Sequence, residues 1–139
     1  MSTLQSLRRF LLVILTIGMA GTVVELLLLQ HDEDAIQLVP LVLLGAALAS
    51  VVWHSARPGT ASARTVRAVM LAFVAAGLAG IYFHYRANVE FQLETDPSLA
   101  GSALLWRVLA AKAPPALAPA IMIQFGLLGL AYTYRDKER

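Results

Sequence analysis

The sequence predicts an all-α integral membrane protein, a four-helix bundle of transmembrane helices with one amphipathic helix at the outer membrane interface between spans three and four. Two observations lead to this fold class. Hydrophobic residues make up 58% of the 139 residues and charged residues 14%, whereas a soluble domain carries about 25% charged residues. The hydrophobic residues are also gathered in four long runs. We therefore expect a single membrane domain over residues 1–139.

The composition excludes several other classes of protein. The chain has no cysteine, which excludes a disulfide scaffold and thiolate chemistry. It has no polar low-complexity segment, so it does not have the composition of a disordered chain. The formal net charge is +2, and no basic patch with interleaved aromatic residues is present. We therefore expect no nucleic-acid partner.

Four apolar runs are each long enough to cross a hydrocarbon core about 30 Å thick. The predicted spans cover residues 10–29, 36–54, 66–85 and 116–134. In the second span, Pro40 lies in the first turns, where a proline removes little helical hydrogen bonding. The fourth span follows Pro114 and Pro115 and carries Pro119 one turn further in.

The first run has an alternative interpretation as a secretory signal. Arg8 and Arg9 precede it, and Gly18, Met19 and Ala20 imitate a small-residue cleavage site. Because the apolar residues continue well beyond this site, to position 29, we interpret the run as a transmembrane span.

The distribution of charge predicts the orientation of the spans. Eight of the eleven basic residues fall in the N-terminal tail, the second connection and the C-terminal tail: Arg8, Arg9, Arg57, Arg64, Arg67, Arg135, Lys137 and Arg139. By the positive-inside rule, both termini are cytoplasmic. Most acidic residues fall on the opposite side, which predicts an acidic extracytoplasmic face. We expect a multi-pass protein of the inner (cytoplasmic) membrane.

The third connection, residues 84–115, is predicted to be ordered. Residues 83–94 contain neither glycine nor proline, so the third helix should continue beyond the membrane to about residue 94. Asp96 and Pro97 then have the pattern of an N-cap and a first helical position. We expect a helix over about 97–112, with Leu105, Trp106 and other apolar residues on one side, at the outer membrane surface or capping the bundle.

Small residues one turn apart predict where the helices pack, because close approach stabilises helix pairs in lipid. The predicted contact residues are Gly18 and Thr22, Gly45 and Ala49, Ala72, Ala76 and Gly80, and Gly126 and Gly129. They indicate a tight bundle without a large central pore.

Glu25 is the ionisable residue that lies well inside a predicted span, about 7 Å from its outer end. An unpaired carboxylate at that depth is costly. One hypothesis is a structural carboxyl group that is protonated or bonded to Gln37, Gln124 or Arg86. The other is an intramembrane proton or cation site that opens to the outside.

A second candidate site is a metal site formed by residues near the outer ends of the spans. His31, Asp32, His84 and Glu90 have the ligand types of a divalent transition metal. No His-x-x-x-His pair supports this set, so a solvated acidic rim that sets topology is the alternative. On the other side of the membrane, His54 follows Trp53 and is expected to be an interfacial histidine without a further role.

These patterns leave three functional hypotheses open. The first is a non-enzymatic accessory or scaffold subunit, whose partners are the lipid bilayer and another membrane protein or a second copy. The second is a small transporter or ion-handling protein that uses Glu25 and the outer cluster, with a divalent cation as ligand. The third is a membrane enzyme for a lipophilic substrate bound near Arg86, Asn88 and Glu90. No known catalytic motif is present, so no catalytic residue and no organic cofactor is predicted.

Overall fold

The structure is a computed structural model that describes residues 3–30 and 34–134. These residues form five helices and no strand, which confirms the all-helical class. The helices are α1 (Thr3–Leu28), α2 (Ala35–Ala56), α3 (Thr60–Thr95), α4 (Gly101–Leu109) and α5 (Ala120–Tyr132). Three of them, α1, α2 and α3, are long and apolar enough to cross a membrane.

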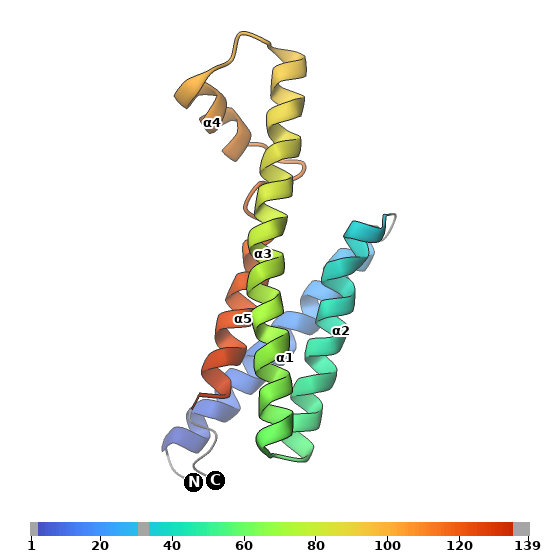
Figure 1. Cartoon of the computed structure of the whole chain (residues 1–139), viewed down its shortest axis with the longest axis vertical. Coiled ribbons are helices and arrows are strands. Elements are labelled where there is room, and N and C mark those ends of the chain that lie inside the picture. Colours follow the sequence, from blue (N-terminus) through green and yellow to red (C-terminus); the bar gives the residue numbers. More distant parts are fainter. Residues whose placement is uncertain (1–2, 31–33, 135–139) are drawn as a thin grey trace.

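The long helix α3 is the axis around which the other helices are arranged (Figure 1). Along one half of α3 runs α5, while α2 lies on its other side and α1 crosses behind. The beginning of α1, the α2–α3 connection and the end of α5 lie together at one end of the molecule. We call this the arginine-rich end, because it carries Arg8, Arg9, Arg57, Arg64 and Arg67.

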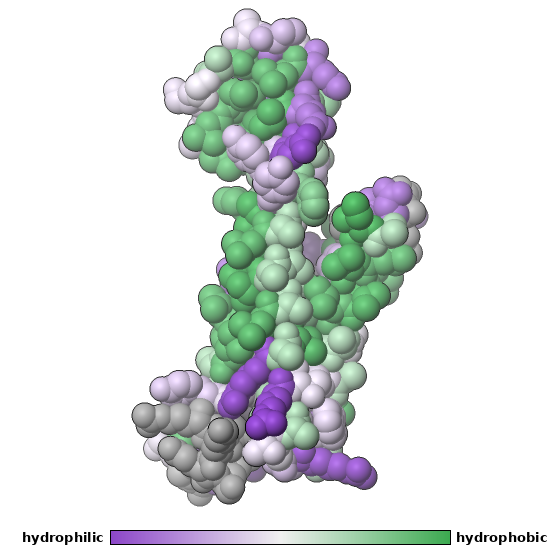
Figure 2. All heavy atoms as spheres, in the orientation of Figure 1, coloured by the Kyte–Doolittle hydropathy of each residue, from purple (hydrophilic) through white to green (hydrophobic). Residues whose placement is uncertain are grey.

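The opposite end consists of the last turns of α3, α4 and the connection over residues 110–114, and we call it the head (Figure 1). It exists because α3 has 36 residues and is therefore about 54 Å long, against a hydrocarbon core of about 30 Å. A hydrophobic band lies between the head and the arginine-rich end, both of which carry hydrophilic side chains (Figure 2).

The fourth apolar run does not form one long helix. Its helix, α5, has 13 residues and is about 20 Å long. The expected span was longer and covered residues 116–134. Before it the chain coils in tight turns, in which Ala118 N–H bonds to Pro115 O and Ala120 N–H to Leu117 O. The physical reason is the prolines at 114, 115 and 119, which lack an N–H group and postpone the regular helix until the last of them.

The helix in the third connection is also shorter than expected. It begins at Gly101, because Asp96 does not cap it. The Asp96 carboxylate instead accepts hydrogen bonds from the Ser98 backbone N–H (3.1 Å) and hydroxyl (2.6 Å). These bonds close a local turn at the end of α3 and lower the pKa of Asp96. The chain therefore leaves α3 through a turn before α4 starts.

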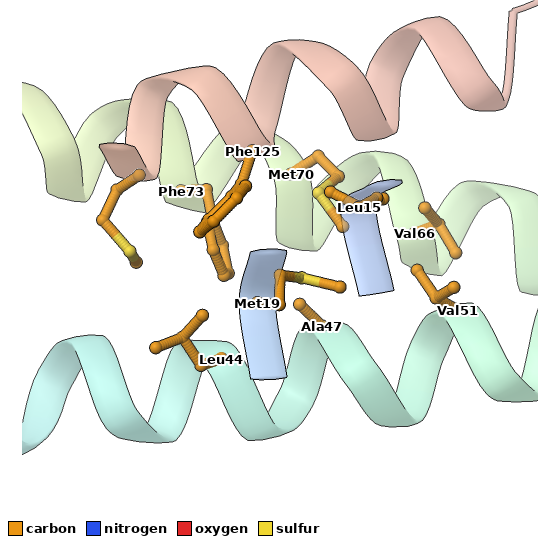
Figure 3. Close-up of a cluster of buried hydrophobic side chains, with 10 residues drawn as sticks. Leu15, Met19, Leu44, Ala47, Val51, Val66, Met70, Phe73 and Phe125 are labelled. Carbon is orange, nitrogen blue, oxygen red and sulfur yellow. The ribbon is translucent and has the colours of Figure 1, made fainter. Parts of the chain in front are cut away.

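Side chains from four helices form one buried apolar cluster between them (Figure 3). Its members are Leu15, Met19, Leu44, Ala47, Val51, Val66, Met70, Phe73, Met122 and Phe125. They come from α1, α2, α3 and α5, so α5 closes the bundle although it is short. The cluster lies toward the arginine-rich half, while Val108 in the head and Ala116, just after the head in sequence, are buried outside this cluster.

Some of the predicted small-residue contacts exist and one is wrong. A Cβ atom placed on Gly126 would lie 2.7 Å from the Met70 carbonyl oxygen, so α5 and α3 touch through their backbones there. Gly18 is equally close to the Phe125 ring. By contrast, a Cβ at Gly45 would meet nothing within 4 Å. The reason is that α2 turns its opposite face, which carries Leu44 and the rest of its cluster residues, toward the bundle.

Candidate functional site

Glu25 lies three residues before the end of α1, on the exposed face of the helix. Its carboxylate forms no hydrogen bond or ion pair with any residue in the described ranges. The expected partners Gln37, Gln124 and Arg86 are therefore not bonded to it. Within residues 3–30 and 34–134, Glu25 lies on the surface, and no group of potential metal ligands includes it.

The predicted metal ligands are only partly within the described residues. His31 and Asp32 lie outside them. The half-buried His84 directs Nδ1 to the carbonyl oxygen of Pro115, at 2.9 Å. Within residues 3–30 and 34–134, no three histidine or carboxylate side chains gather as a metal centre. The full set with His31 and Asp32 stays a prediction.

Glu90 belongs to an exposed ion pair. Its carboxylate accepts a hydrogen bond from Arg86 at 2.7 Å, one helical turn earlier, and the two side chains are 61% and 60% exposed. This bond raises the pKa of the Arg86 guanidinium. The pair faces water, whereas Asn88 between them is buried on another face of α3. The enzyme hypothesis requires one pocket lined by all three residues. Since they lie on different faces of α3, they do not line such a pocket.

Asn88 and His84 attach the head to α3. The Asn88 amide nitrogen donates to the carbonyl oxygens of Pro114 (2.9 Å) and Val108 (3.5 Å). His84 lies one turn before Asn88 and bonds Pro115 in the same connection. The side chain of Asn88 is 2% exposed, so these bonds form where water does not compete strongly. They hold the chain after α4 against α3.

The head has large apolar side chains on its surface. The exposed ones on α4 and the adjoining part of α3 include Phe91, Leu105, Trp106 and Leu109. Trp106 is 73% exposed and Phe91 63%. Figure 2 shows hydrophobic side chains gathered over the head and bordered by hydrophilic ones. We call these four residues the apolar face of the head.

A pocket of about 400 Å³ lies at the arginine-rich end. Among the described residues, four segments line it: the start of α1, the end of α2, the α2–α3 connection and the end of α5. The lining residues are Gln5, Arg8, Arg9, Leu12, His54, Ser55, Pro58 and Tyr132. None of them is acidic and two are arginines. Small-molecule sites in proteins have about this volume.

Hydrogen bonds hold the deep side of this pocket in place. Arg8 is 7% exposed and donates to the Tyr134 carbonyl oxygen at 2.6 Å. His54 is 3% exposed, and its Nδ1 lies 2.8 Å from the Ser62 hydroxyl. The same hydroxyl lies 3.0 Å from the Arg57 carbonyl oxygen and 3.1 Å from that of Gly59. The Tyr132 ring meets the imidazole edge-on, with 5.7 Å between centroids.

The structure buries His54, which the sequence did not predict, because the α2–α3 turn and the end of α5 cover it. Its assignment as an interfacial histidine stays a prediction. The pocket itself left no local signal in the sequence, because its residues come from four separate segments.

No known protein family, no curated protein and no solved structure matches this chain.

Proposed function

We propose that this protein is a four-span membrane protein that acts as a non-enzymatic accessory or scaffold subunit, with its head on the extracytoplasmic side. In this topology α1, α2 and α3 are three spans, and the turns over 115–119 together with α5 are the fourth. The proposal is supported by the common location of the start of α1, the α2–α3 connection and the end of α5 (Figure 1). The arginines of that end then follow the positive-inside rule.

The observation that carries the scaffold function is the apolar face of the head. The exposed Arg86–Glu90 pair has to lie outside the hydrocarbon core, because charged side chains are costly within it. Phe91 is further along α3 than this pair, and the end of α4 reaches the level of Asn88 through Val108. The apolar face is therefore beyond the hydrocarbon core. Exposed apolar patches in such a position are typical of protein contact sites.

The shape of the head also favours a contact function over catalysis. Its buried Asn88 and half-buried His84 side chains are bonded to the backbone carbonyls of Val108, Pro114 and Pro115. These bonds stabilise the head as a rigid support for α4. A rigid support reduces the entropy that a partner's binding would cost.

Single-cysteine labelling tests the topology, since the natural chain has no cysteine. Glu94→Cys in the head and Arg64→Cys at the arginine-rich end both replace exposed residues. In intact cells a membrane-impermeant maleimide should label Glu94→Cys, whereas Arg64→Cys should be labelled only after permeabilisation. The reverse order would overturn the orientation, and labelling of both in intact cells would overturn the four-span count.

Tryptophan fluorescence tests whether the apolar face lies outside the lipid. The chain has two tryptophans, so Trp53→Phe leaves Trp106 as the single reporter and Trp106→Phe leaves Trp53. In vesicles of brominated phosphatidylcholine, Trp53 should be strongly quenched and Trp106 weakly. Equal quenching of both would contradict a protein-contact surface and would instead mean that α4 is embedded in the membrane interface.

A further inference from the structure

Gln124 is a polar residue on the outward face of α5, which lies at the edge of the bundle (Figure 1). The next residues along the helix, Phe125 and Gly126, face the core and α3. Gln124 is exposed, as are the apolar Ile121 and Leu127 on the same side of the helix. Its amide forms no hydrogen bond with any other residue in the described part of the chain.

The contact between α5 and α3 places Gln124 near the middle of the hydrophobic band. A Cβ atom on Gly77 of α3 would lie 3.0 Å from the backbone nitrogen of Ile123, the residue before Gln124. Gly77 is halfway between Arg67 and Arg86 in sequence, hence about 14 Å from each along the helix. Between these two arginines α3 carries no Asp, Glu, Lys or Arg, and their separation of about 29 Å matches the thickness of a hydrocarbon core. Gln124 is therefore about equally far from both membrane surfaces.

An amide that faces hydrocarbon at this depth is unfavourable. Moving an amide group from water into an apolar medium costs free energy unless it forms a hydrogen bond there. Lipid tails have no donor or acceptor, so polar side chains of transmembrane helices bond across contacts between helices. Because Gln124 is on the outward face of the bundle, the group that satisfies it in a membrane has to come from outside this chain.

A second copy of the chain carries such a group at the right depth. Copies inserted in the same orientation hold Gln124 at the same level of the membrane. An amide both donates and accepts hydrogen bonds, so two Gln124 side chains complement each other across a two-fold axis along the membrane normal. A two-fold contact is the commonest kind in homo-oligomers. Ala131, two turns after Gln124, is also exposed, and its small side chain allows two α5 helices to approach closely.

We infer that the outward face of α5 binds the same face of a second copy, with the two Gln124 amides hydrogen-bonded to each other at its centre. The face consists of Ile121, Gln124, Leu127 and Ala131. A single polar residue within an apolar helix contact also sets the register of the two helices. The inference rests on the membrane location of α5 in the proposed topology. It does not depend on the apolar face of the head, which lies at another level of the molecule.

Förster energy transfer between copies of the full-length protein in phosphatidylcholine vesicles measures the association. Arg64→Cys carries the donor or the acceptor dye, and transfer should rise to saturation with the ratio of protein to lipid. Gln124→Leu should weaken the association about fivefold, since a hydrogen bond between helices in lipid contributes about 1 kcal/mol. Gln124→Asn retains the amide and should keep most of the association. A monomer at every ratio, or equal association of Gln124→Leu and the natural protein, would overturn the inference.

Cysteine crosslinking in the same vesicles tests which face makes the contact. Ala131→Cys lies on the outward face of α5, and Ala49→Cys is the same change at an exposed position of α2. With copper phenanthroline as oxidant, Ala131→Cys should form a disulfide-linked dimer and Ala49→Cys should not. Equal dimer yields would overturn α5 as the contact. Maleimide labelling of Glu94→Cys and Arg64→Cys reports the topology separately, so the expected labelling without an Ala131→Cys dimer overturns this inference alone.

Discussion

Replacing Gly126 by alanine tests the contact between α3 and α5, on which the short α5 depends. The added Cβ would lie 2.7 Å from the Met70 carbonyl oxygen and 3.2 Å from the Val74 backbone nitrogen. Both are backbone atoms of α3, so no side-chain rotation can relieve the clash. The two helices have to move apart, which would loosen the packing of the neighbouring Phe125 in the core.

A matched control separates the destabilisation caused by this clash from the stabilisation caused by the higher helix propensity of alanine. Gly45→Ala adds the same methyl group to α2, where a Cβ would meet nothing within 4 Å. In both variants the change from glycine favours the helix by about 0.5–1 kcal/mol. Overpacking costs about 1–3 kcal/mol and applies to Gly126→Ala alone. The free energy of unfolding should therefore differ between the two variants by about 1–3 kcal/mol.

Reversible unfolding in mixed micelles of dodecyl maltoside and SDS, followed by circular dichroism, measures this difference. Gly45→Ala should be as stable as the natural protein or slightly more stable, and Gly126→Ala clearly less stable. If both variants gained the same stability, the close approach of α5 to α3 would be refuted. The core described between α1, α2, α3 and α5 would then need a different arrangement.

Three further predictions concern the head and α1. Asn88→Ala should destabilise the attachment of the head by about 1–3 kcal/mol, because the hydrogen bonds from the buried Asn88 amide to the Pro114 and Val108 carbonyls are lost. Faster hydrogen exchange in α4 would reveal this, and unchanged exchange would contradict it. Since Ser98 lowers the pKa of Asp96 below its ordinary value of 3.8, the stabilisation of their turn should be complete above that value and be lost as the pH falls through the lowered pKa. An NMR titration of the Ser98 amide should show this loss, and Asp96→Asn should abolish the pH dependence. Glu25→Gln should leave the free energy of unfolding within about 0.5 kcal/mol of the natural protein in the same micelles, because the exposed carboxylate has no partner among the described residues. A cation-dependent change in stability that Glu25→Gln removes would instead favour the ion-handling hypothesis.

The sequence by itself determined the helical class and most helix positions, because these depend on local properties. Long apolar runs require every backbone group to be paired within a helix, and the run from 83 to 94 without glycine or proline allowed α3 to extend into the head. Local chemistry also explains the late start of α5, although the combined effect of three prolines is evident only in the hydrogen bonds of the turns.

Which face of each helix meets a neighbour was decided only by the tertiary structure. Gly45 and Gly126 have the same pattern in sequence, but only Gly126 contacts another backbone. The outward direction of Glu25 and the burial of His54 likewise depend on how α1 and α2 are rotated in the bundle. In an apolar helix nearly every face is hydrophobic, so periodicity does not mark the buried one. For this reason the pocket that joins Arg8, His54 and Tyr132 could be found only once four separate segments had been placed together.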